Sequence, residues 1–174
     1  MMTLHRSRRQ LWPVVAILAA LAAANAHAQD PHLRASSPET PPIPSPVAVP
    51  LDAGTLAALP REAVSARVHE TPLECEGVAL FALLRASGAV PDGALRSAQL
   101  SRYVLVDARD GYRVLFSLAE LDPGTGRRGA WLVDRCNGAA LDGKDGPLRL
   151  LVPDDARAAR SVRQVESVNV VVAP

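Results

Sequence analysis

The chain has 174 residues, of which 48% are hydrophobic, 21% are charged and only 3% are aromatic. Its 19 Lys and Arg are nearly balanced by 18 Asp and Glu. A surface for nucleic acid needs clustered cations with interleaved aromatic side chains. Because the sequence has no such stretch, we expect no nucleic-acid partner.

Residues 1–28 have the three parts of a secretory signal peptide. A basic stretch that contains Arg6, Arg8 and Arg9 precedes the apolar run Val14 to Ala24, and Ala26-His27-Ala28 provides small residues at a cleavage site. A membrane anchor is the alternative, but a transmembrane helix needs roughly 20 apolar residues. We expect cleavage before Gln29, a periplasmic or secreted protein, and no membrane contact afterwards.

The export route has two alternatives. Ser7-Arg8-Arg9-Gln10-Leu11 contains the arginine pair of the twin-arginine pathway, which exports folded proteins. The rest of that motif is absent, so the general secretory route stays open. Cleavage leaves 16 Lys and Arg against 18 Asp and Glu, a net charge of −2.

The two cysteines, Cys75 and Cys136, would lie in an oxidising compartment after export. They form either a disulfide or two buried free thiols. Neither has another Cys or a His at zinc-ligand spacing, so we predict no metal site built by the protein.

Residues 29–62 are predicted to be a Pro- and Ala-rich tether, because proline neither continues a helix nor donates to a strand ladder. The folded domain is then expected over residues 63–174, long enough for one core. Six prolines mark the tether: Pro38, Pro41, Pro42, Pro44, Pro46 and Pro50.

The first half of the domain is predicted to be strand, helix, strand. Residues 64–69 alternate weakly and indicate a strand, and residues 78–86 place apolar side chains on one helical face. Gly88 stands where a C-terminal helix cap is expected. Residues 103–106 form a continuous apolar run, which predicts a strand buried on both faces.

The second half is predicted to consist mostly of strands joined by tight turns. Asp110-Gly111 and Asn137-Gly138 are hairpin signals, and Tyr112 to Leu118 alternate as in a half-buried strand with Tyr112 facing inward. Residues 156–163 have the composition of one or two helical turns. The fold class is therefore α+β: a mixed, strand-rich sheet with hairpins and few short helices. The remaining strands are expected at 131–133, 148–152 and 168–172.

Five segments in order resemble the molybdopterin-binding domain of the sulfite oxidase family, over about residues 64–172. The resemblance implies that family's fold for this domain. The segments are Gly77-Val78-Ala79-Leu80-Phe81-Ala82-Leu83-Leu84, Asp110-Gly111-Tyr112 with Ser117-Leu118, Asn137-Gly138-Ala139-Ala140-Leu141, Gly146-Pro147-Leu148-Arg149-Leu150-Leu151-Val152-Pro153, and Ser161-Val162-Arg163.

The resemblance also implies a site for the pterin phosphate. Guanidinium groups and exposed backbone N–H groups suit a phosphate. Two structural alternatives remain. Arg149 is then the outward residue of a strand, and Arg157, Arg160 and Arg163 form a solvated helical face balanced by Asp154 and Asp155. The implied cofactor contacts are Arg149, Ser161, Val162 and Arg163, with Asp107 as a looser match and Lys144 where the family has a histidine.

The metal-binding part of the family is not matched. Cys75 lies only two residues before Gly77 and lacks the family's cysteine loop, so we do not expect it to bind molybdenum. We predict no catalytic residue, and His69 is expected to be an ordinary strand residue.

These observations lead to two hypotheses for function. The first is an exported, metal-free module that binds a small anion or a periplasmic partner protein. The alternative is a molybdopterin-dependent oxidoreductase that transfers an oxygen atom, or a cofactor-carrying subunit of one. Molybdopterin is thus a cofactor that only the resemblance suggests.

Overall fold

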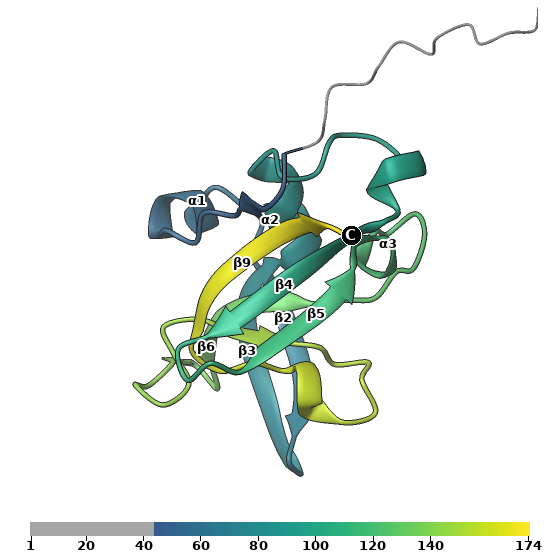
Figure 1. Cartoon of the computed structure of the whole chain (residues 1–174). Helices are drawn as coiled ribbons and strands as arrows, with labels where there is room; N and C mark the ends of the chain where they lie inside the picture. The colour runs from purple at the N-terminus through teal and green to yellow at the C-terminus, as the bar shows by residue number, and fades with distance from the viewer. Residues whose placement is uncertain (1–43) are drawn as a thin grey trace, which may run out of the picture. The chain divides into compact units, whose positions relative to one another are not determined.

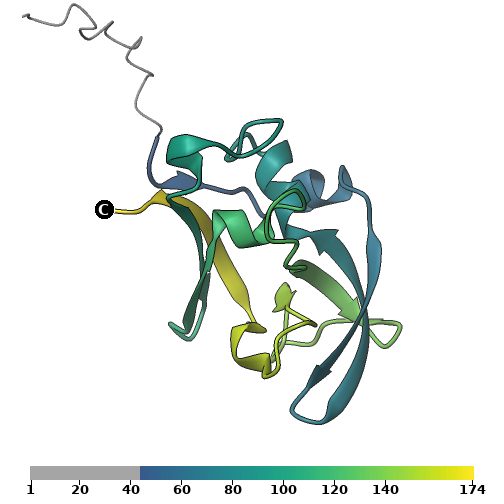
Figure 2. The same cartoon turned by 90° about the vertical axis from the view of Figure 1, so that its right-hand side faces the viewer.

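Two antiparallel sheets face each other across the main core (Figures 1 and 2). The first sheet has the strand order β1-β9-β4-β5, and the second has the order β2-β3-β6-β7, with β8 also paired to β6. The first sheet consists of β1 (Val47–Ala48), β9 (Val165–Val172), β4 (Arg102–Ala108) and β5 (Arg113–Ser117). The second consists of β2 (Glu62–Val68), β3 (Thr71–Ala79), β6 (Trp131–Cys136), β7 (Ala139–Ala140) and β8 (Arg149–Leu151).

This computed structural model describes residues 44–174, so the expected signal peptide lies outside the described residues, as does the tether before Pro44. In the described part, no helix is long and apolar enough to cross a membrane. The fold is α+β and strand-rich, with few short helices, as predicted. The helices are α1 (Ala53–Ala57), α2 (Leu80–Ala86), α3 (Leu118–Leu121) and two 3-10 turns at Ser97–Gln99 and Ala158–Arg160.

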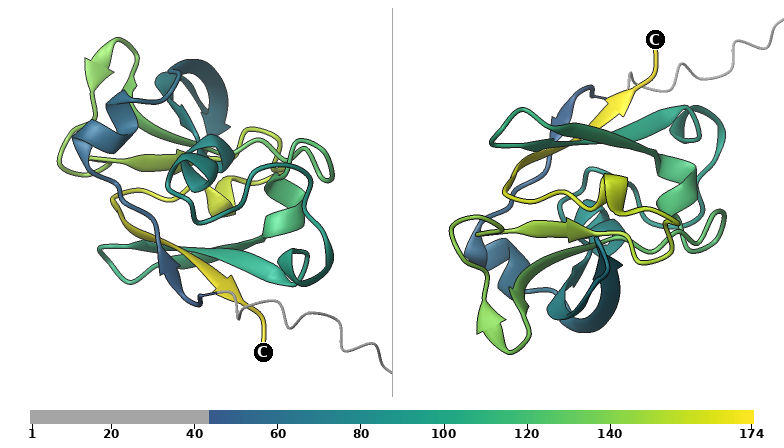
Figure 3. Two further views of the ribbon diagram at one scale, coloured as in Figure 1. Left: turned by 90° about the horizontal axis from the view of Figure 1, so that it is seen from above. Right: turned by 90° about the horizontal axis from the view of Figure 1, so that it is seen from below.

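The main core fills the space between the sheets, which appear as two layers in Figure 3. Val104 and Phe116 of the first sheet and Leu132 and Leu150 of the second are almost completely buried. Helices α2 and α3 lie at one end of the two layers, and the 158–160 turn and the tip of the β2–β3 hairpin lie at the other (Figures 1 and 2).

A second, smaller apolar cluster lies on the other side of the second sheet. Its buried members come from β2, β3, β6 and β8, so this sheet is packed on both faces. They are Val64, Val68, Cys75, Val133 and Leu151.

Both predicted hairpins are confirmed. Asp107 of β4 pairs with Arg113 of β5 around the Asp110-Gly111 turn, where Asp110 Oδ1 accepts the Tyr112 N–H at 2.9 Å. Asn137 and Gly138 have φ of 50° and 79°, the left-handed pair of a two-residue hairpin turn.

The predicted helix over 78–86 begins two residues late, at Leu80. Gly77 explains the delay, because β3 approaches β6 so closely there that a Cβ would lie 2.1 Å from the Leu132 carbonyl oxygen. The chain therefore stays in the strand through Ala79, paired with Trp131. Gly88 has a φ of 71° just after the helix, as a C-terminal cap requires.

The prediction that residues 103–106 are buried on both faces is wrong. Val104 and Val106 face the main core, whereas Tyr103 and Leu105 are half-buried. The opposite face of the first sheet is partly open to solvent, since Leu115 on neighbouring β5 is 59% exposed. Tyr112, predicted to face inward, is 49% exposed.

The folded part of the chain begins before Ala63, inside the segment expected to be a tether. Val47 of β1 pairs with Val170 of β9, and the Val49 N–H donates to the Val168 carbonyl at 2.9 Å. Val49 is 5% exposed. The apolar residues between the prolines thus add an edge strand, which the density of prolines hides in the sequence.

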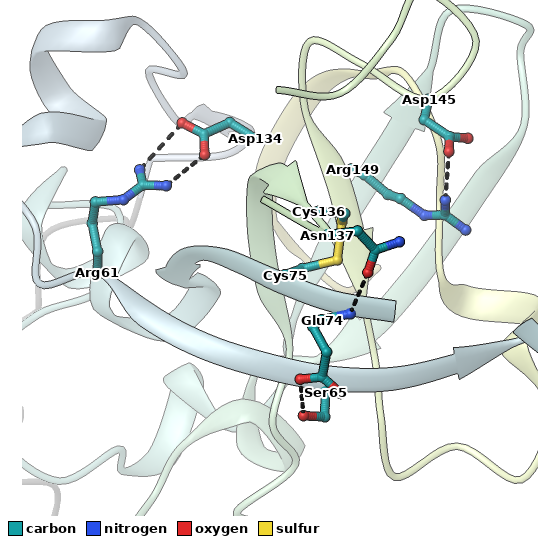
Figure 4. Close-up of a disulfide and its surroundings, with 9 residues drawn as sticks. All are labelled: Arg61, Ser65, Glu74, Cys75, Asp134, Cys136, Asn137, Asp145 and Arg149. Carbon is teal, nitrogen blue, oxygen red and sulfur yellow. Dashed lines mark hydrogen bonds and ion pairs between the residues drawn. A yellow bond between two sulfur atoms is a disulfide. The ribbon is translucent and has the colours of Figure 1, made fainter. Parts of the chain in front are cut away.

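Of the two alternatives for the cysteines, the structure has the disulfide. Cys75 and Cys136 are direct partners across β3 and β6 and are joined through a sequence separation of 61 residues. Figure 4 shows this bond beside the β2–β3 strands. The bond fixes the base of the β2–β3 hairpin to β6, which also carries β8.

A crosslink across 61 residues restricts the unfolded chain. We expect the double substitution Cys75→Ala with Cys136→Ala to lower the free energy of unfolding by about 2–4 kcal/mol. Urea denaturation of the oxidised protein and of the variant measures the difference. A variant with the same transition midpoint and slope as the wild type would contradict the stabilising role of the bond.

Candidate anion-binding site

A polar cleft lies at the end of the molecule where the β2–β3 hairpin meets the 158–163 segment. Two cavities of about 380 Å³ and 250 Å³ share His69, Ser161 and Arg163 as lining residues. We call them together the polar cleft, defined by His69, Asp145, Arg149, Ser161 and Arg163. Its larger half also contains Val68, Thr71 and Leu73, and its smaller half contains Tyr112, Ala158, Ala159 and Val162.

Arg149 is the buried cation of the polar cleft. It lies on β8 opposite Val133 of β6 and is only 5% exposed. Its Nη1 donates to Asp145 Oδ2 at 2.9 Å (Figure 4), whereas its buried Nε has no hydrogen-bond partner. A buried charged donor without a partner is costly, and Arg149 also lines the larger cavity. The interpretation of Arg149 as an outward strand residue is therefore wrong.

Arg163 is the second cation and reaches the same carboxylate. Its Nε is 3.9 Å from Asp145 Oδ1, and its side chain is 61% exposed. The two arginines thus converge on Asp145, while Asp154 and Asp155 pair with neither of them. Two guanidinium groups that lie close together repel each other unless a negative charge lies between them. Asp145 supplies one negative charge for the two arginines.

Ser161 and the backbone around it provide further polar groups. The Ser161 hydroxyl oxygen accepts the Val152 N–H at 3.2 Å, and among the described residues no acceptor for its proton is found. The hydroxyl proton is therefore free to point at a ligand in either cavity.

Tyr112 forms the wall of the smaller cavity. Its hydroxyl donates to the Ala159 carbonyl at 2.7 Å, which fixes the ring against the 158–160 turn. His69 stands opposite in the β2–β3 turn, where it has a φ of 46° and an exposed side chain.

The 158–163 segment is held in place by a charge network. Arg160 makes two hydrogen bonds of 2.8 Å to the Asp155 carboxylate and one of 2.8 Å to Glu120, and lies 4.5 Å above the Phe116 ring. The bonds to Asp155 and Glu120 raise the pKa of Arg160, and Arg160 in turn lowers the pKa of Asp155. Arg160 is thus neutralised and structural, while Arg163 three residues later is not.

The turn that carries Asp145 is also fixed. Asp142 Oδ1 accepts the backbone N–H groups of Lys144 at 2.9 Å and Asp145 at 3.0 Å, and these bonds lower the pKa of Asp142. The Asp145 carbonyl accepts the Gln164 N–H at 2.9 Å. The position of Asp145 beside Arg149 is therefore set by the backbone.

The structure brings four of the six predicted contact residues together. Arg149, Ser161 and Arg163 line the larger cavity, and Val162 lines the smaller one. Asp107 lies on the first sheet and bonds Arg113 and Ser167, outside both cavities. Lys144 is exposed and contributes its backbone N–H to the Asp142 turn, so neither residue belongs to the cleft.

Sequence reasoning missed His69, Tyr112 and Asp145. His69 carries one usable signal, since it is the only histidine after His32. Asp145 stands four residues before Arg149, a spacing that indicates a pair only once the turn between them is known. Tyr112 gave no signal, because it continues the apolar alternation of β5.

The described residues do not provide a molybdenum ligand where the family resemblance would place one. The Cys75 sulfur is bonded to Cys136, so it has no thiolate to give a metal. Among residues 44–174, no group of three or more His, Cys, Asp or Glu side chains could hold a metal ion. The described residues therefore do not fit a molybdenum site.

A larger apolar hollow of about 690 Å³ lies beside α2, with Phe81 and Pro123 in its wall. Its polar side chains are already bonded within the protein: Arg85 to the Pro91 and Gly93 carbonyls, and Glu62 to the Trp131 indole. A binding site combines a cavity with convergent polar groups that still seek a partner. Within residues 44–174, the polar cleft brings Arg149, Arg163 and Ser161 to one cavity in this way.

No family model and no curated protein sequence matches this chain. The candidate site therefore rests on the geometry of the polar cleft alone.

Proposed function

We propose that this protein is an exported, metal-free module that binds a small oxyanion in the polar cleft. The single observation that carries the proposal is Arg149: an arginine only 5% exposed that lines a cavity and has one carboxylate partner, Asp145. Arg163 and the Ser161 hydroxyl complete a set of donors for two or three oxygens of one anion.

The charges of the larger cavity support an anion rather than a cation. Arg149 and Arg163 contribute two positive charges and Asp145 one negative charge, while Asp110 adds one negative charge at the smaller cavity. Charge-assisted hydrogen bonds from guanidinium groups are the strong contacts that oxyanion recognition uses.

The proposed fold is that of the sulfite oxidase molybdopterin-binding domain. In this chain the cofactor site would keep its anion-binding arginines and lack the metal ligand. The convergence of Arg149, Ser161, Val162 and Arg163 supports this origin. The Cys75–Cys136 disulfide argues against the alternative, an oxidoreductase working through molybdenum, because it leaves neither cysteine among the described residues as a thiolate ligand.

We expect Arg149→Ala to weaken the binding of inorganic phosphate by about ten- to hundredfold, because one charge-assisted contact is worth roughly 1.5–3 kcal/mol. Arg163→Gln should weaken it less, by roughly threefold to tenfold, since solvent screens the exposed Arg163 guanidinium. Isothermal titration calorimetry at constant ionic strength measures both.

Arg113→Gln is the matched control for Arg163→Gln. The two side chains are 65% and 61% exposed, and each substitution removes one positive charge, but Arg113 lies on β5 outside the polar cleft. Equal losses of phosphate affinity in the two variants would show that only the net charge of the protein matters. Unchanged phosphate affinity in Arg149→Ala would contradict the proposed anion site.

Elemental analysis of protein purified from the periplasm separates the module from the oxidoreductase. We expect less than about 0.05 molybdenum per chain, because a cysteine in a disulfide offers no thiolate to a metal. Stoichiometric molybdenum that is lost in Cys75→Ser would reverse the conclusion and establish the oxidoreductase.

A further inference from the structure

The carboxylate of Asp145 has a consequence for which anions the polar cleft can hold. We propose that Asp145 selects ligands by charge, so that the polar cleft takes a singly charged oxyanion with an organic substituent, of the sulfonate or phosphodiester class, in preference to a doubly charged one. This proposal rests on the proposed function, since it names the ligand class of the same site.

Asp145 is held in place when a ligand enters the polar cleft. Its N–H and its carbonyl are both held, by Asp142 and by Gln164. Arg149 Nη1 is buried against its carboxylate at 2.9 Å, and removal of that partner would leave an uncompensated buried charge. The ligand therefore binds beside Asp145, against the Arg149 guanidinium, Arg163 and Ser161.

The charge of the larger cavity is set by three side chains. With Asp145 in place, the larger cavity has two guanidinium groups and one carboxylate, which together balance one negative charge. Asp110 adds a further carboxylate at the edge of the smaller cavity. One negative charge on the ligand neutralises the larger cavity, whereas a second would remain uncompensated in a partly desolvated site and face both carboxylates.

The walls of the polar cleft also contain apolar side chains. Val68 and Leu73 line the larger cavity, and Tyr112, Ala158, Ala159 and Val162 line the smaller one. These apolar groups gain nothing from the oxygens of sulfate or phosphate. They contact the carbon substituent that a sulfonate or phosphodiester carries, so both charge and surface favour the same class.

Sulfate and methanesulfonate are the probes, because they have similar size, carry two charges and one charge, and do not change charge near neutral pH. Their affinities are measured by calorimetry at one pH and one ionic strength. We expect wild-type protein to bind methanesulfonate several-fold more tightly than sulfate, and this comparison needs no variant.

Asp145→Asn keeps a hydrogen-bond acceptor beside Arg149 and removes the charge. We expect it to tighten sulfate binding by about tenfold and methanesulfonate binding by about threefold, since the electrostatic change in log Kd for the dianion is twice that for the monoanion. Asp92→Asn is the control: Asp92 is exposed, lines neither cavity, and its substitution makes the same change of net charge.

The outcomes are distinct. Wild-type protein that prefers sulfate, or an Asp145→Asn variant whose two affinities change by the same factor, would overturn charge selection by Asp145 and leave the anion site standing. Absence of binding of both probes to wild-type protein and to Asp145→Asn would overturn the proposed function itself. If Asp145→Asn does not fold, as judged by circular dichroism, a wild-type preference for sulfate still overturns the proposal.

Discussion

A guanidinium taken out of water needs a counter-charge, and the Arg149–Asp145 pair is the contact on which the polar cleft depends. Arg149 is 95% buried because β8 pairs with the middle of the second sheet, between two apolar clusters. The desolvation of such a group costs several kcal/mol unless it is paired and hydrogen-bonded. The Asp145 carboxylate accepts a hydrogen bond from Arg149 Nη1, and the buried Arg149 Nε has no partner.

The rest of the second sheet holds the two sides of the cleft in position. The Cys75–Cys136 bond ties β3 to β6, and β6 pairs with β8 through Val133 and Arg149. The hairpin that ends in His69 and the strand that carries Arg149 are therefore connected through one central strand. On the other side, the bonds of Arg160 to Asp155 and Glu120 fix the segment that carries Ser161 and Arg163.

Much of the fold could be predicted from local patterns. The turns at Asp110-Gly111 and Asn137-Gly138 were predictable because left-handed turn residues are a local requirement. The face of α2 was predictable from spacing, but its start was not, since the close approach of Gly77 to the Leu132 carbonyl is a contact between distant segments. The edge strand β1 was hidden for the same reason: only its pairing with β9 orders it.

The candidate site was predictable in part. Arg149, Ser161, Val162 and Arg163 came from the order of segments that resembles a family, and they do meet in the cleft. Asp107 and Lys144 came from the same resemblance and lie elsewhere, because the first sheet and the 142–146 turn direct them away. Asp145, His69 and Tyr112 depend on tertiary contacts of three separate turns, which no local pattern shows.

The most direct test of the anion site is the ¹⁵N–¹H signal of the Arg149 Nε–H during a titration with methanesulfonate and with phosphate. Because Arg149 lines the larger cavity and is only 5% exposed, an anion bound there changes the environment of its Nε–H more than that of an exposed arginine outside the cleft. We predict a large, saturable shift of this signal, together with shifts of the backbone N–H signals of Ser161 and Arg163. An Arg149 Nε–H signal that stays in place at saturating anion, while exposed arginines such as Arg113 shift, would contradict it.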